Sequence, residues 1–128
     1  MQLRIKRGGF TLIELVVVMA IVALLVSIAA PRYFRSIERA RENVLHENLV
    51  LMRDAIDKFN ADTGHYPGTI EELASKRYLR KIPDDPVTGS ATTWVIVPPP
   101  DSSGLSGVYD IKSGAEGNGM DGSAYSSW

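Results

Sequence analysis

The sequence contains no cysteine among its 128 residues. Disulfide bonds and thiolate chemistry are therefore excluded, although export from the cytoplasm is not. Catalytic arrangements are also missing. His46 lies in an expected helix beside Glu42 and Glu47, His65 lies in an expected turn, and no serine has the strand-to-helix context of a nucleophile. We expect no catalytic residue and no enzyme activity.

Acidic residues are absent from the first nine positions, which carry Arg4, Lys6 and Arg7. The rest of the chain holds 11 basic and 15 acidic residues, a formal charge of −4. A mildly acidic body disfavours nucleic acid as a partner, so none is expected. The length leaves room for one membrane segment and one small globular domain.

Polar residues are scarce in residues 10–30, a 21-residue run interrupted only by Thr11, Glu14 and Ser27. As a helix rising about 1.5 Å per residue, this run is roughly 31 Å long, close to the apolar thickness of a bilayer. It predicts a transmembrane helical segment over 10–30. A secretory signal peptide is the alternative, because "SIAA" is similar to a cleavage site, but its apolar region is typically shorter.

Glu14 is the unusual residue of this run. A carboxylate in a membrane segment costs several kcal/mol unless it is paired, which makes Glu14 a functional candidate. The helix dipole favours negative charge near a helix N-terminus, which explains why it is tolerated. A cut between Gly9 and Phe10 would also create a charged partner for Glu14. The new α-amine, with a pKa of about 8, would neutralise Glu14 of a neighbouring subunit and set the register of packed helices.

Residues 7–33, "RGGFTLIELVVVMAIVALLVSIAAPRY", resemble the N-terminus of the type IV pilin and type II secretion pseudopilin superfamily. The shared features are a short basic leader ending in glycine, then Phe-Thr-Leu-Ile-Glu and a hydrophobic helix. The resemblance implies removal of leader 1–9 by a prepilin peptidase after Gly9, N-methylation of Phe10, and assembly through Glu14. Gly8 departs from the family, in which a charged residue more commonly precedes the final glycine.

Pro31 lies within what the pattern predicts to be one long helix. It removes a backbone donor and its ring crowds the carbonyl of Ser27, so a kink or local melting is expected there. In the resembling filaments, a proline at this place accompanies a helix break as subunits leave the membrane. The alternative is that Pro31 only marks the membrane boundary.

Residues 31–64 predict an amphipathic helix. Its apolar residues recur at alternating spacings of four and three and are expected to form the core of a small domain. They are Leu45, Leu49, Met52, Ile56 and Phe59. Thr63 and Gly64 are expected to end the helix, since glycine suits the left-handed cap conformation.

Residues 65–128 predict a small α+β globular region packed on 31–64. "TIEE" fits a capping box with Thr69 as the cap and Glu72 reaching back, and it predicts a short helix through about Tyr78. "TTWVIV" and "GVYDIK" predict two strands joined by a turn-rich segment. The expected fold class is α+β and pilin-like: a long N-terminal helix, membrane-spanning and then amphipathic, packed against a small antiparallel sheet.

The body also resembles the major pseudopilin of type II secretion, through "YPGTIEEL", "YLRKIPDDPVTG" and a glycine-rich acidic tail. Ile82, Pro83, Asp85 and Pro86 match a leucine-proline-x-aspartate-proline element of that family, with isoleucine replacing the leucine.

A C-terminal acidic loop binds calcium in that family. Glu116 and Asp121 are the matching candidates here, but the paired aspartates usual in the family are missing. Calcium needs about six to eight oxygen ligands, several of them carboxylates. We therefore expect no strong calcium site, and the resemblance implies no other cofactor.

The resemblance implies a structural subunit of a type II secretion pseudopilus, polymerising through its N-terminal helix to drive export of folded periplasmic proteins. Implied partners are copies of itself in a helical homopolymer, minor pseudopilins, the prepilin peptidase, the inner-membrane assembly platform, and the membrane before assembly. The alternatives are a type IV pilin or minor pilin for adhesion, motility or DNA uptake, and a membrane-anchored binding module that never polymerises.

The resemblance also implies a single-pass inner-membrane protein with a cytoplasmic N-terminus and a periplasmic C-terminal domain, followed by a periplasmic or cell-surface filament. Flanking charges leave the orientation ambiguous. The arginines after the span, Arg32, Arg35, Arg39 and Arg41, outnumber the three bases of the leader.

Overall fold

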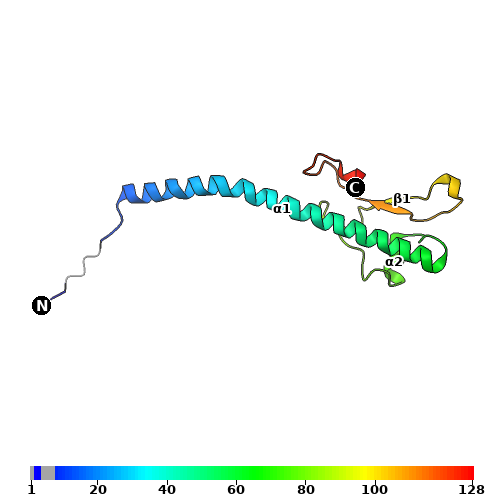
Figure 1. Cartoon of the computed structure of the whole chain (residues 1–128). Helices are drawn as coiled ribbons and strands as arrows, with labels where there is room; N and C mark the ends of the chain where they lie inside the picture. Colours follow the sequence, from blue (N-terminus) through cyan, green and yellow to red (C-terminus); the bar gives the residue numbers. More distant parts are fainter. Residues whose placement is uncertain (1, 4–7) are drawn as a thin grey trace. The chain divides into compact units, whose positions relative to one another are not determined.

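The computed structural model describes residues 2–3 and 8–128, so the basic residues at positions 4, 6 and 7 lie outside it. In chain order the elements are α1 (Leu12–Thr63), α2 (Ile70–Ser75), β1 (Val95–Val97), the 3-10 helix η1 (Asp101–Ser103), β2 (Asp110–Lys112) and the 3-10 helix η2 (Tyr125–Ser127) (Figure 1).

The chain divides into two compact units, Met1–Ile37 and Glu38–Trp128, and α1 contributes residues to both. The boundary between the units therefore lies within the long helix, several residues beyond Pro31. The segment boundaries expected from the sequence, after residues 9, 30 and 64, stay predictions.

α1 continues through Pro31, so the local melting expected at this residue is not present in the structure. Proline cannot donate the hydrogen bond that would reach the carbonyl of Ser27, but this loss is limited to one bond. The neighbouring turns remain helical on both sides. The helix break that the family resemblance implies on assembly stays a prediction.

The C-terminal end of α1 lies where the sequence predicted it. Thr63 is the last helical residue, and Gly64 has a φ of 79° and donates its N–H to the carbonyl of Asn60 at 2.8 Å. This left-handed φ is readily accessible only to glycine, and it turns the chain out of the helix.

The apolar stripe of α1 forms the core of the Glu38–Trp128 unit, as predicted. Its five side chains are at most 2% exposed. They share one hydrophobic cluster with Ile70 and Leu73 of α2, Ile111 of β2, Trp94 and Tyr125. Figure 1 shows α2 and β1 beside the C-terminal part of α1.

The predicted strands are both present, each three residues long. β1 and β2 pair antiparallel with the register Val95↔Lys112, Ile96↔Ile111 and Val97↔Asp110. Two strands alone are marginal in water. Ile111 is completely buried, so β2 supplies the contact that attaches this small sheet to the core.

α2 is shorter than predicted, ending at Ser75 rather than near Tyr78. Arg77 adopts a φ of 64°, and the N–H of Tyr78 donates to the carbonyl of Leu73 at 2.9 Å. This is the hydrogen-bond pattern of a Schellman cap, in which glycine usually occupies the left-handed position. An arginine at that position gave no signal that the helix would end.

The capping box expected at Thr69 is also wrong. Thr69 is the N-cap of α2, but its side chain makes no capping hydrogen bond. Glu72 Oε2 instead accepts the N–H of Gly68 at 2.7 Å. The carbonyl of the preceding residue, Pro67, accepts the N–H of Val108 at 2.7 Å. This tertiary contact fixes how the chain enters α2.

The proline-rich segment after α2 folds around Asp85, which is completely buried. The Asp85 carboxylate accepts the N–H of Val87 at 2.8 Å and the hydroxyl of Ser113 at 2.5 Å. Its own N–H donates to the carbonyl of Ser90 at 2.9 Å. A buried carboxylate needs such partners, so Asp85 both shapes its turn and ties it to the segment after β2.

Candidate functional site

The N-terminus of α1 holds Glu14 in a reciprocal pair of hydrogen bonds with Thr11. The Thr11 N–H donates to Glu14 Oε2 at 3.0 Å, and the Glu14 N–H donates to Thr11 Oγ1 at 3.2 Å. Because α1 begins at Leu12, Thr11 is the N-cap and Glu14 the third helical residue, which makes this pair a capping box. The box was not predicted, although Thr-Leu-Ile-Glu has the required spacing.

The box uses one of the two carboxylate oxygens of Glu14. Within the described residues, Oε1 accepts no hydrogen bond. An ionised carboxylate can accept several hydrogen bonds, so Glu14 can cap its own helix and still receive a cationic donor.

Each polar side chain of the apolar run makes at least one hydrogen bond within the chain. Thr11 and Glu14 pair with each other, and the Ser27 hydroxyl donates to the carbonyl of Leu24 at 2.7 Å. Polar groups placed in hydrocarbon need such internal partners. Thr11 and Ser27 are therefore compatible with a lipid environment, whereas these bonds provide no opposite charge for Glu14.

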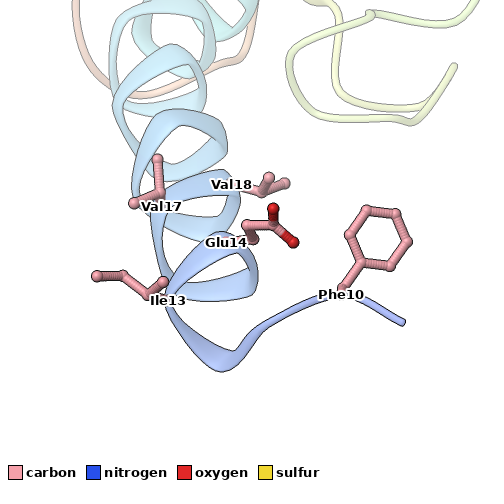
Figure 2. Close-up of a pocket in the computed structure, with 5 residues that line it drawn as sticks. All are labelled: Phe10, Ile13, Glu14, Val17 and Val18. Carbon is pink, nitrogen blue, oxygen red and sulfur yellow. The ribbon is translucent and has the colours of Figure 1, made fainter. Parts of the chain in front are cut away.

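Glu14 lies at the edge of an open apolar hollow formed with Phe10, Ile13, Val17 and Val18 (Figure 2). Figure 2 shows the Glu14 carboxylate and Val18 on the side of the helix that faces the Phe10 ring. Phe10 is 91% exposed, and α1 is exposed from Leu12 to Ala29. It is the one helix of the described residues that is long and apolar enough to cross a membrane.

The bond between Gly9 and Phe10 precedes α1 and is exposed. A Cβ built on Gly8 or Gly9 would meet no atom within 4 Å, so neither position requires glycine for space within the chain. An exposed, non-helical segment without side chains is a geometry that a peptidase groove can accept.

Comparisons with known proteins match the N-terminal segment and, in full-length relatives, most of the chain. The prokaryotic N-terminal methylation motif matches residues 4–30. The type II secretion system core protein G of Escherichia coli (strain K12) is 29% identical over 124 residues, which cover 84% of this chain and 81% of that protein.

The proteins of the same name from Vibrio cholerae and Pseudomonas aeruginosa are each 28% identical. These matches cover 91% and 89% of this chain, and 90% and 87% of the relatives. Over most of its length the chain is therefore similar to core protein G of type II secretion systems. The resemblance stated from the N-terminal residues is thereby confirmed. No solved structure matches the chain.

The structure does not bring together the two residues matched to the pseudopilin calcium loop. Asp121 Oδ1 accepts the hydroxyl and the N–H of Ser123 at 2.6 and 2.9 Å, and these bonds lower the pKa of Asp121. Asp121 lines one hollow, which it shares with Arg39, whereas Glu116 lines another. Among the described residues, no group of three or more His, Cys, Asp or Glu side chains is placed to hold a metal ion. Glu116 and Asp121 therefore line separate hollows and do not form the paired carboxylates of the calcium loop in that family.

Two charged residues of α1, Glu42 and Arg53, make tertiary contacts that were not predicted. Glu42 lies three residues before Leu45, so it continues the spacing of the apolar stripe and is buried with it. Glu42 is 9% exposed and accepts hydrogen bonds from Met120 and Tyr125. Arg53 donates to Asp110 and to main-chain oxygens. Their partners are more than 55 residues away in sequence, so helical spacing could not identify these partners.

The two histidines have packing roles. His46 is exposed but stacks on Trp128, with ring centroids 4.1 Å apart, and His65 meets the edge of Phe59 at 5.4 Å. Turn packing was among the roles expected of them, whereas the stack on Trp128 was not predicted.

Proposed function

We propose that this protein is the structural subunit of a type II secretion pseudopilus, which polymerises through the N-terminal part of α1 to drive export of folded proteins. The observation that carries the proposal is the similarity to core protein G of type II secretion systems. The match extends over 84–91% of the chain in the three relatives above, so it includes most of the globular unit.

Exposed apolar surface on residues 12–30 supports membrane anchoring before assembly. A continuous apolar surface of this kind is not stable in water and needs lipid or other helices as its surroundings. We place the segment across the inner membrane, with the globular unit in the periplasm. Assembly then replaces lipid contacts by contacts between the helices of neighbouring subunits.

Processing at Gly9 prepares the subunit for assembly. In this proposal a prepilin peptidase hydrolyses the Gly9–Phe10 bond, removes the basic leader and methylates the new amine of Phe10. The amine remains cationic after methylation, and it begins the chain one residue before the N-cap of α1. The cut thus places a positive charge at the end of the helix that carries Glu14.

Pairing between this amine and Glu14 of a neighbouring subunit supplies the register of the filament. An ionisable side chain within a membrane segment is costly, and an opposite charge offsets part of that cost. The unused Oε1 of Glu14 supports this role, because the carboxylate can accept the amine without breaking its capping box. Minor pseudopilins and the assembly platform are the further proposed partners.

Mass spectrometry of culture supernatants tests the function. A deletion strain is compared with the parent and with strains complemented by the wild-type gene or by Glu14→Ala. We expect a defined set of secreted proteins to disappear on deletion and to return only with the wild-type gene. Unchanged supernatants, together with loss of twitching, attachment or DNA uptake, would instead identify a type IV pilin or minor pilin.

A further inference from the structure

Arg53 connects α1 to β2 and to the last residue of the chain. Its Nε donates to Asp110 Oδ1 at 2.7 Å, and its guanidinium also donates to the main-chain oxygens of Ile111 at 2.9 Å and Trp128 at 3.0 Å. The side chains of Arg53 and Asp110 are 36% and 32% exposed, so water is partly excluded from the pair. The Arg53 guanidinium therefore binds three oxygen atoms, two from β2 and one from Trp128.

Glu42 connects the same helix to the loop that precedes Trp128. Its Oε1 accepts the N–H of Met120 at 2.6 Å and the hydroxyl of Tyr125 at 3.2 Å. Tyr125 is itself buried, and its burial together with the nearby charge of Glu42 raises the pKa of its hydroxyl. Hydrogen bonds to a carboxylate are stronger than those between neutral groups, so this contact fixes the loop on α1.

Trp128 closes the loop from the other side. Its indole N–H donates to the hydroxyl of Ser123 at 2.6 Å, while its ring stacks on His46. A Cβ built on Gly119 would collide with the Trp128 ring, so glycine is needed there for the close approach. The N–H of Gly119 donates to the carbonyl of Ser123 at 2.8 Å, which completes a closed turn.

We infer that two side chains of α1 hold the C-terminal loop, residues 113–128, on this helix. Arg53 acts as the cation and Glu42 as the anion, so that the loop folds without calcium. A calcium site would gather main-chain and carboxylate oxygens around one cation. Arg53 does so here with two main-chain oxygens and one carboxylate oxygen. The planar fork of a guanidinium suits several acceptors at once, whereas Glu116 and Asp121 do not converge on a common point.

The inference concerns folding of the globular unit and does not depend on the proposed function. Its test is thermal unfolding of the full chain in detergent micelles, followed by the fluorescence of Trp94 and Trp128, in excess EDTA and in millimolar calcium. We expect the same wild-type midpoint in both conditions. Arg53→Met should lower the midpoint by roughly 5–15 °C in both, because it removes three hydrogen bonds that join α1 to β2 and to Trp128.

Arg41→Met is the matched control. Arg41 also lies on α1, but its ion pair with Glu38 joins neighbouring positions of the helix and is exposed. Such pairs contribute little, so its midpoint should lie within about 2–3 °C of the wild type. Asp110→Asn is the milder variant if Arg53→Met fails to fold, and it should lower the midpoint by an intermediate amount.

Two results would overturn the inference. A wild-type midpoint that rises with calcium concentration, and saturates, would mean that a metal ion holds the loop. Equal midpoints for Arg41→Met, Arg53→Met and Asp110→Asn would mean that the Arg53 contacts do not hold the loop.

Discussion

The two parts of α1, residues 12–29 and 30–63, have opposite surroundings. From Leu12 to Ala29 every residue is exposed, including all the large apolar ones, whereas the apolar stripe of the later part is at most 2% exposed. Charged residues follow the same division: the early part has Glu14, and the later part has Glu42 and Arg53 bound to distant segments.

The two parts of α1 therefore have different structural roles. The later part packs against segments of its own chain, so its apolar residues recur at helical spacing and leave a polar face. The early part is apolar on all faces, which is typical of a helix whose partners are lipid or other helices. We therefore expect substitutions in the two parts to affect different measurements.

Phe59→Ala should have the largest effect and should act on folding alone. Removing a buried aromatic ring costs about 3–5 kcal/mol of unfolding free energy. Chemical denaturation followed by Trp94 fluorescence measures this loss. Leu51→Ala is the control on the same helix, because Leu51 is half exposed and its truncation should change the stability by about 0.5 kcal/mol or less. Equal losses for both variants would contradict the packing described here.

Leu24→Arg should instead act on membrane insertion. A central arginine costs about 2.5–3.5 kcal/mol on insertion scales, so the variant should shift from the membrane fraction towards the soluble or aggregated fraction. Alkaline extraction of membranes measures the shift. Val50→Arg, on the exposed surface of the later part, should leave the membrane fraction unchanged. Retention of Leu24→Arg in membranes at the wild-type level would argue against a spanning role for residues 10–30.

Thr11→Val should weaken the start of α1, whereas Thr69→Val should leave α2 almost unchanged. Only Thr11 makes a side-chain capping bond, and losing such a bond costs about 0.5–2 kcal/mol. Amide exchange of Glu14 in micelles should therefore accelerate, while the unfolding midpoint of Thr69→Val should stay near the wild type. Similar effects of the two changes would contradict the different caps.

The smallest effect should be a pH dependence restricted to the later part. The pKa of Tyr125 is raised in the folded state, so the folded chain keeps a proton that the unfolded chain loses near its ordinary pKa of about 10. Its stabilising contribution is thus complete below pH 10 and is lost as the pH rises beyond it. Denaturation between pH 8 and 11 should show a shallower decline for Tyr125→Phe. An unchanged slope of stability against pH would mean that Tyr125 does not contribute to this pH dependence.

Patterns carried by neighbouring residues were sufficient for much of the fold. Spacing along the helix predicted the buried stripe, Gly64 predicted the end of α1, and β-branched residues predicted both strands. The N-terminal motif predicted the family without any knowledge of the fold.

Features set by distant contacts could not be predicted. Glu42 and Arg53 face residues 57 to 83 positions away, and Arg77 ends α2 in a conformation that usually indicates glycine. The two Thr-x-x-Glu segments show the same limit. Thr11 and Glu14 form a capping box at an exposed helix start, whereas Glu72 binds Gly68, beside the anchored Pro67.

The central claim is that Glu14 pairs with a charge on a neighbouring subunit in addition to capping its own helix. Glu14→Gln separates the two roles, because a glutamine amide can keep the capping box but carries no charge. The decisive measurement is the yield of sheared filaments from cells that produce wild type, Glu14→Gln or Glu14→Ala. Our account predicts that neither variant yields filaments, while Glu14→Gln retains the amide protection of the first turn in micelles. Wild-type filament yield from Glu14→Gln would contradict it and reduce Glu14 to a helix cap.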